Sequence, residues 1–127
     1  MEEVILVVDD QEINRIGVSC ALNSLGYKVD EAPSGEAALV KLQAGNFDAV
    51  LMDYHMAPGM TGSECAEVIR ARETGSAKRV PIIVLSSETN SVVKKTCLAS
   101  GIDVFLDKSC SIEKLHETLQ SVLKAAS

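Results

Sequence analysis

Polar residues able to bind a cation or a phosphoryl group come directly after apolar runs in this sequence. Asp53 follows the apolar residues 49–52, and the acidic pair Asp9 and Asp10 follows residues 4–8. A carboxylate at the end of a buried strand is unfavourable unless it is paired, bound to a metal or used in chemistry. These three acids are therefore candidates for a metal site or a phosphoryl site.

Two further apolar runs end in residues that could complete such a site. Residues 82–85 lead into Ser86, and residues 104–106 lead into Asp107 and Lys108. A hydroxyl and an ammonium group can both donate hydrogen bonds to phosphoryl oxygens. The carboxyl ends of parallel strands meet at one edge of an open α/β sheet, where ligands bind. The sequence therefore predicts that these side chains converge.

Phosphoryl transfer to Asp53 is the chemistry that this set of residues favours. A carboxylate can accept a phosphoryl group, and the reaction needs an in-line nucleophile and neutralisation of the phosphoryl charge. Three carboxylates placed together repel one another without a cation, and Mg²⁺ or Mn²⁺ prefers such oxygen ligands. Lys108 would then supply a positive charge to the phosphoryl group, and Ser86 a hydroxyl donor.

The elements that must position these residues alternate along the chain. Short apolar runs alternate with longer stretches of helical period, which indicates repeated βα units and a parallel sheet. Strands are expected at residues 4–8, 28–32, 49–52, 82–85 and 104–107, and helices over about 13–25, from Ser34 to Gly45, from Thr61 onward, over about 91–100 and over about 111–125. Residues 49–52 show no polar alternation, which indicates a central strand, whereas the more polar residues 28–32 indicate an edge.

Local signals support several helix boundaries. Ser34 is a predicted N-cap, and Thr61 with Glu64 has the spacing of a capping box. Gly26 and Gly101 are expected to end their helices. The first helix has one stripe, with Leu22 and Leu25 beside it, made of Ile13, Ile16, Gly17, Cys20 and Ser24.

Composition excludes several classes of protein. The chain has 127 residues, 46% of them hydrophobic, which suits one domain with a full core. Its net charge of −6 argues against nucleic-acid binding. The cysteines form no CxxC pair, and no stretch approaches the length of a membrane span. We expect a cytoplasmic protein with reduced thiols and a single domain over residues 1–127, without an output domain in this chain.

The chain resembles the receiver domains of two-component response regulators over essentially its full length. The positions that carry the resemblance, in order, are Asp9, Asp10, Asp53, Ser86 and Lys108. Residues 10–15 resemble receivers attached to hybrid histidine kinases in particular. The resemblance implies a flavodoxin-like (βα)5 fold, in which helices cover both faces of a five-stranded parallel sheet of order 2-1-3-4-5.

The resemblance also implies a role for each residue of the site. Asp53 would be the phosphoacceptor, and Asp10 would bind Mg²⁺ directly. Asp9 would act mainly through a metal-bound water, and the backbone carbonyl of His55 would complete the protein ligands. The domain would be a signalling phosphoacceptor that assists its own phosphorylation and dephosphorylation, and it would not be an enzyme in its own right.

Two kinds of protein partner follow from the same resemblance. A histidine kinase or a histidine phosphotransfer protein would donate the phosphoryl group. Phosphorylation of Asp53 would then draw Ser86 toward the phosphoryl group and let Phe105 turn inward. A downstream protein would read this change on the helix at about 91–100, the strand at 104–107 and the helix at about 111–125.

The sequence departs from the family pattern in two loops and in the switch hydroxyl. Ala57 stands where the family usually has Pro, and Gly62 comes one residue late, which indicates an inserted residue that could alter partner choice. Ser109 follows Lys108 where a cis-bonded Pro is usual, and both cis and trans forms stay open. Ser86 replaces the commoner Thr and keeps the hydroxyl donor.

Two alternative functions compete with phosphoacceptance. One is a receiver-like module that works by protein contact without phosphorylation. The other is a Mg²⁺-dependent aspartyl phosphatase, which would need a second Asp two residues after Asp53, where His55 stands. His55 and Glu88, two residues beyond Asp53 and Ser86, also lie where the receiver family tunes hydrolysis.

Overall fold

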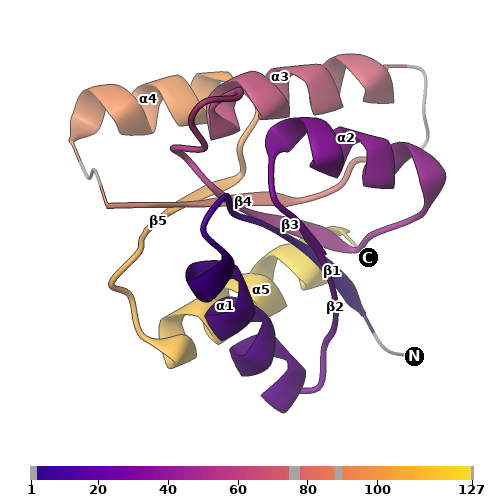
Figure 1. Cartoon of the computed structure of the whole chain (residues 1–127), viewed down its shortest axis with the longest axis vertical. Coiled ribbons are helices and arrows are strands. Elements are labelled where there is room, and N and C mark those ends of the chain that lie inside the picture. The colour runs from indigo at the N-terminus through magenta and orange to yellow at the C-terminus, as the bar shows by residue number, and fades with distance from the viewer. Residues whose placement is uncertain (1–2, 75–77, 88–89, 127) are drawn as a thin grey trace.

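The computed structural model describes residues 3–74, 78–87 and 90–126, and within these ranges five strands alternate with five helices (Figure 1). Their order and bounds are β1 (Val4–Val8), α1 (Glu12–Ser24), β2 (Lys28–Ala32), α2 (Gly35–Ala44), β3 (Ala49–Asp53), α3 (Gly62–Glu73), β4 (Ile82–Ser86), α4 (Ser91–Ala99), β5 (Val104–Asp107) and α5 (Ile112–Ala126). All paired strands are parallel, in the order β2-β1-β3-β4-β5. This confirms the predicted topology, with β3 central and β2 at an edge.

Helices cover both faces of the sheet, as Figure 1 shows, with α2, α3 and α4 on one face and α1 and α5 on the other. Successive strand residues point to opposite faces, so neighbours in β1 such as Leu6 and Val7 join different core clusters. All five residues of β3 are buried. A strand covered on both faces needs apolar side chains throughout, which explains the missing polar alternation in residues 49–52.

The helix signals read from the sequence act as expected. Ser34 Oγ accepts a hydrogen bond from the backbone N–H of Ala37 at 3.0 Å. Thr61 and Glu64 form a reciprocal capping box, with bonds of 3.2 and 2.9 Å. Gly26 and Gly101 adopt φ values of +98° and +96°, a left-handed conformation that favours glycine at a helix end.

The face that α1 presents to the sheet differs from the stripe picked out in the sequence. Ile13 is 86% exposed and Ile16 is 46% exposed, while the buried residues of the helix are Ser19 and Leu22. Both stripes have helical period, so the local pattern alone did not distinguish them. The stripe that begins at Ile13 therefore faces solvent.

The loop after β3, in which the sequence indicates an inserted residue, returns to the end of the strand. The only cis peptide bond among the described residues joins Ala57 to Pro58 in this loop. Gly62 donates a backbone hydrogen bond to the carbonyl of Tyr54 at 2.8 Å. A Cβ at Gly62 would lie 3.0 Å from the backbone oxygen of Asp53, so glycine permits this close approach.

Candidate functional site

The three predicted acids meet at the carboxyl ends of β1 and β3. Val8 pairs with Met52 in adjacent strands, so the residues that follow them emerge side by side. One carboxylate oxygen from each of Asp9, Asp10 and Asp53 lies within 4.8 Å of the others. The predicted convergence of acids distant in sequence is confirmed.

Lys108 reaches this cluster from the end of β5. Its Nζ lies 3.1 Å from Oδ1 of Asp53, whose side chain is only 7% exposed. The backbone N–H of Lys108 donates to the carbonyl of Ser86 at 3.0 Å, which holds the start of the loop against β4. The Lys108–Ser109 bond, whose form the sequence left open, is trans.

The other predicted residues lie around the cluster at different distances. Ser86 ends β4, is 1% exposed, and follows Leu85, which pairs with Asp53. Phe105 pairs with Val84 and is half-buried against the core under α2, α3 and α4. His55 is exposed, and its ring makes an edge contact with that of Tyr54. Glu88 lies outside the described residues.

Burial sets the acid–base behaviour of the cluster. It raises the pKa of the Asp53 carboxyl above its ordinary value; the hydrogen bond and charge of Lys108 oppose this rise, and the charge of Asp10 adds to it. Burial also raises the pKa of Asp9, against the hydrogen bond from the Gln11 N–H. Ionising the cluster therefore costs free energy when no cation is bound.

This cost predicts a pH-dependent stability for the cation-free domain. A carboxyl whose pKa is raised on folding binds protons more tightly in the folded chain, so protonation stabilises the fold. That stabilisation is complete below the ordinary pKa of 3.8 and is lost as the pH rises through the raised pKa. We expect Asp53→Asn to increase the free energy of unfolding at pH 7 by about 1 kcal/mol, with less gain toward pH 4.

Urea unfolding in the presence of a chelator measures this difference. A variant less stable than the wild type at pH 7 would show that the contact with Lys108 outweighs the cost of burying the Asp53 charge. That result would contradict a raised pKa for Asp53 in the folded domain.

The donor set fits a hard divalent cation. Three ionised carboxylates and one ammonium leave a net charge of −2 at the cluster. Mg²⁺ and Mn²⁺ take oxygen ligands and are commonly bound by a few carboxylates together with water and phosphate oxygens. Asp10 is exposed while Asp9 and Asp53 are buried, so the cluster is open on one side.

Sequence reasoning did not identify Arg15 as part of this region. Its Nη1 donates to the backbone carbonyl of Asp9 at 2.8 Å, and its Nε pairs with Glu31 at 2.9 Å. The sequence signal for Arg15 was its place in the motif of residues 10–15. Its partner Glu31 lies on β2, 16 residues further along the chain. Only the register of β1 and β2 brings the two together.

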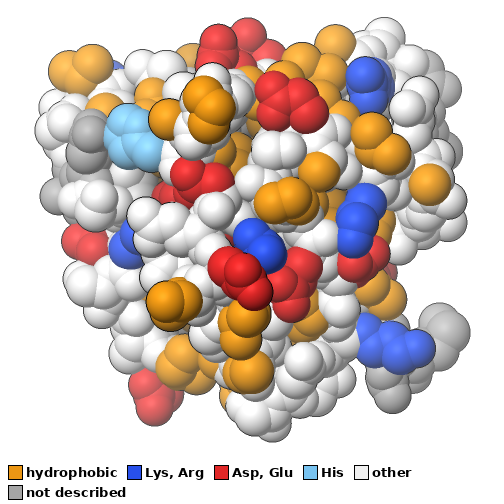
Figure 2. Space-filling model, in the orientation of Figure 1, with side chains coloured by type: hydrophobic (Ala, Val, Ile, Leu, Met, Phe, Trp, Pro, Cys, Tyr) orange, Lys and Arg blue, Asp and Glu red, His pale blue; other side chains and the backbone are white. Residues whose placement is uncertain are grey.

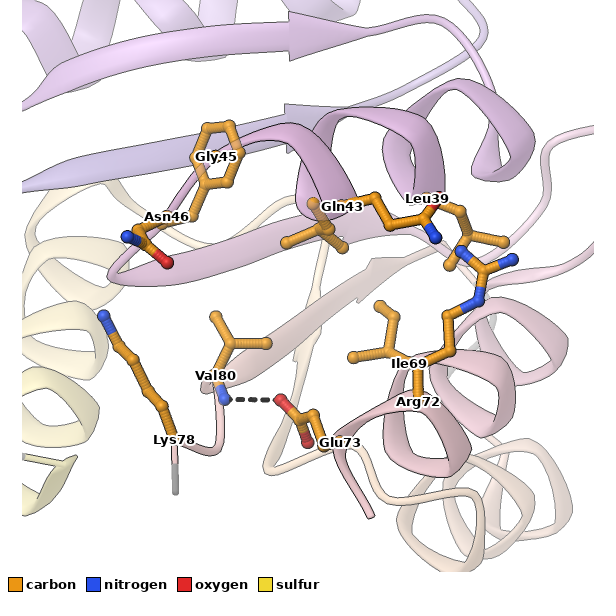
Figure 3. Close-up of a pocket in the computed structure, with 11 residues that line it drawn as sticks. Leu39, Gln43, Gly45, Asn46, Ile69, Arg72, Glu73, Lys78 and Val80 are labelled. Atoms are coloured by element: carbon orange, nitrogen blue, oxygen red, sulfur yellow. Dashed lines mark hydrogen bonds between the residues drawn. The ribbon is translucent and has the colours of Figure 1, made fainter. Parts of the chain in front are cut away.

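A separate groove lies near the amino ends of β3 and β4, between the C-terminal parts of α2 and α3 (Figure 3). It has a volume of about 240 Å³, and its apolar lining includes Leu39, Ile69 and Val80. Glu73 at its rim accepts a hydrogen bond from the Val80 N–H at 2.7 Å. The groove is distinct from the candidate site, because its lining includes none of Asp9, Asp10, Asp53 and Lys108.

Two further expectations concern thiols and membranes. Burial raises the pKa of Cys65 to about 11, and it also raises the pKa of Cys97 and Cys110. These thiols are therefore protonated at neutral pH.

No helix within the described parts of the chain has the length and apolar character needed to cross a membrane.

Comparison with known proteins adds independent information. The model of the response regulator receiver domain family matches residues 5–120. The sensory/regulatory protein RpfC of Xanthomonas campestris is 32% identical over 114 residues, covering 90% of this chain but only 16% of RpfC. This chain thus spans a small part of the curated relatives that it matches.

Solved structures show the same fold. CheY4, a chemotaxis protein of Vibrio cholerae, matches with a TM-score of 0.87 and 35% identity, covering 96% of this chain and 99% of CheY4. The receiver domain of sensor histidine kinase PA1611 from Pseudomonas aeruginosa matches with a TM-score of 0.87 and 31% identity, covering 98% and 99% of the two chains. That structure has a magnesium ion coordinated in its active site cleft.

Proposed function

This chain belongs to the response regulator receiver domain family of two-component and phosphorelay signalling, and from that membership we propose that Asp53 accepts a phosphoryl group from a phosphohistidine in a Mg²⁺-dependent reaction. The observation that carries the proposal is that Asp53 lies beside the acid pair Asp9 and Asp10 and in contact with Lys108. Lys108, and a cation held by the acid pair, would place positive charge where the phosphoryl group develops negative charge.

The proposed reaction gives each residue a distinct role. An Asp53 oxygen forms a bond to phosphorus as the N–P bond of the phosphohistidine breaks, and the released imidazole takes a proton from solvent. Asp9, Asp10, Asp53 and the His55 carbonyl would hold the cation, Mg²⁺ or Mn²⁺. When bound, the cation would neutralise charge on the phosphoryl oxygens. Lys108 holds Asp53 in place and supplies a second positive charge.

Incubation with acetyl phosphate and Mg²⁺, followed by intact-mass measurement, tests the proposal. We expect the mass of one added phosphoryl group with Mg²⁺ and none with excess chelator. No gain under either condition would favour a module that acts by contact alone. Steady turnover of a small phosphate ester would instead favour the aspartyl phosphatase reading, in which His55 occupies the position of the general acid.

The phosphodonor must bring its histidine to the edge of the sheet that carries the acids. Receiver domains of hybrid histidine kinases interact with histidine kinases or phosphotransfer proteins. In Figure 2, acidic side chains gather beside a basic one near the middle of the face, and hydrophobic side chains lie over α1 below them. The exposed stripe of α1, which includes Ile13 and Ile16, begins just after Asp10. This exposed apolar stripe supports a docking surface for the phosphodonor protein beside the site.

A charged substitution in this stripe should separate docking from chemistry. We expect Ile16→Asp to slow phosphotransfer from a phosphohistidine protein by roughly tenfold, because a charge would be buried in an apolar contact. Phosphorylation by acetyl phosphate should change less than about twofold. Val40→Asp, at a position 66% exposed on α2, is the matched control. Equal loss with both donors would argue against a docking role for α1.

We also propose that phosphorylation is read out on α4, β5 and α5. Ser86 is buried next to the strand that bears Asp53, and half-buried Phe105 packs against the core one strand away. Val92 and Leu98 on α4 are 71% and 47% exposed, which suits contact with a protein partner. Ser86→Ala should be phosphorylated but bind the partner several-fold more weakly than phosphorylated wild type. Unchanged partner binding would contradict a coupling through Ser86.

We propose that residues 1–127 form one receiver domain, supported by the family match over residues 5–120. The expectations of a cytoplasmic location and of no contact with nucleic acid rest on composition, including the net charge of −6.

A further inference from the structure

Arg15 lies between the acid cluster and the edge strand β2. It lies on α1, yet its side chain is only 16% exposed. Its guanidinium makes two contacts at once, donating Nη1–H to the Asp9 carbonyl at 2.8 Å and Nε–H to Oε1 of Glu31 at 2.9 Å. Glu31 belongs to the edge strand β2 and is 38% exposed. The arginine thus links the loop after β1 to β2.

Both backbone groups of Asp9 are held by this arrangement. Its N–H donates to the carbonyl of Ala32 in β2 at 3.1 Å, and its carbonyl accepts from Arg15. Its side chain accepts from the N–H of Gln11 at 2.9 Å. The carbonyl of Asp9 belongs to the peptide that joins it to Asp10. Fixing that peptide therefore sets the direction in which the Asp10 side chain leaves the loop.

We propose that Arg15 and Glu31 act as a pair of positioning residues that hold the Asp9–Asp10 loop in the geometry required to bind a divalent cation. This inference rests on the proposed function, which makes the acid cluster the cation site. Ionised carboxylates repel one another, so a free loop would carry Asp9 and Asp10 away from Asp53 before the cation arrives. A held loop reduces the rearrangement needed on binding.

The pair acts through position because its charges cancel locally. The guanidinium of Arg15 is neutralised by Glu31, so together they change the net charge near the acids little. Arg is suited to the task because its planar fork can serve two acceptors in fixed directions, whereas a lysine offers a point charge on a flexible stem. Arg15→Lys should therefore retain only part of the effect.

Calorimetric titration of the unphosphorylated domain with MgCl₂ tests the inference without any phosphotransfer. We expect Arg15→Ala to weaken Mg²⁺ affinity by roughly tenfold, in line with the loss of a group that orients metal ligands. Glu31→Gln and Arg15→Lys should each weaken affinity by a smaller factor. Adding Glu31→Gln to Arg15→Ala should weaken it no further, because the two residues act as one unit.

Arg70, on α3, provides a matched control away from the acid cluster. It has a similar exposure of 17% and a similar network, with Nε 2.9 Å from the Gly101 carbonyl and Nη1 2.7 Å from Glu73. It contacts none of the acids at the site. We expect Arg70→Ala to lower the urea midpoint of unfolding while leaving Mg²⁺ affinity within about twofold of wild type.

The outcomes separate this inference from the proposed function. A folded Arg15→Ala variant that binds Mg²⁺ within twofold of wild type would overturn the positioning role while leaving the cation site intact. Failure of the wild type to bind Mg²⁺ would overturn the proposed function and this inference with it. Should Arg15→Ala fail to fold, unchanged Mg²⁺ affinity in both Arg15→Lys and Glu31→Gln would overturn the positioning role.

Discussion

Asp53→Asn should lose phosphorylation by both acetyl phosphate and a phosphohistidine protein, with incorporation reduced on the order of 100-fold or more. Asparagine preserves the size of the side chain but removes the anionic oxygen that would attack phosphorus. Lys108 forms its ion pair with Asp53, so we expect neither Asp9 nor Asp10 to take over as the nucleophile. Intact-mass measurement after incubation with each donor gives the result directly.

A neighbouring carboxyl group serves as the control for Asp53→Asn. Glu12 is exposed in the first turn of α1 and lies outside the acid cluster. Glu12→Gln should be phosphorylated by acetyl phosphate within about twofold of wild type. Full incorporation into Asp53→Asn would place the phosphoryl group on another residue and remove the basis of the proposed function. The Asp53→Asn variant is expected to fold, since loss of the buried Asp53 charge stabilises the domain at neutral pH.

Asp10→Asn should weaken Mg²⁺ affinity by roughly 10-fold to 100-fold and slow phosphorylation at limiting Mg²⁺. The substitution takes one of three carboxylates from the cation site and leaves a weaker amide oxygen. Because the loss lies in cation binding and not in the nucleophile, a large excess of Mg²⁺ should restore part of the rate. The half-saturating Mg²⁺ concentration for labelling by acetyl phosphate is the measurement.

Asp10 also distinguishes a cation site from a cluster of acids without a cation. Asp10 is exposed while its two partners are buried, so replacing it should disturb the fold little. An unchanged half-saturating Mg²⁺ concentration would show that Asp10 is not a ligand and that the cation, if required, is bound elsewhere. Loss of rate that excess Mg²⁺ cannot restore would indicate a role in the reaction beyond binding.

Local sequence patterns specify the alternation of strands and helices and the order of the site residues along the chain. Runs such as residues 4–8 and 49–52 are apolar throughout because both faces of their strands are covered, and this signal is local. The capping box of Thr61 and Glu64 is local too. Parallel strands all end at one edge, so acids placed directly after apolar runs had to approach one another. Pattern and chain direction thus placed Asp53 at the same edge as Asp9 and Asp10, and the pairing of β1 with β3 brings them into one cluster.

Which helix faces are buried, and which distant residues meet, depends on how the helices and strands pack together. Two stripes of α1 have the same helical period, and packing against the sheet buries the one with Leu22 and leaves Ile13 in solvent. The contacts of Lys108 with Asp53 and of Arg15 with Glu31 depend on strand order and register. Helical period and turn chemistry are set within a few residues, but these contacts join segments whose spacing only the packed sheet defines.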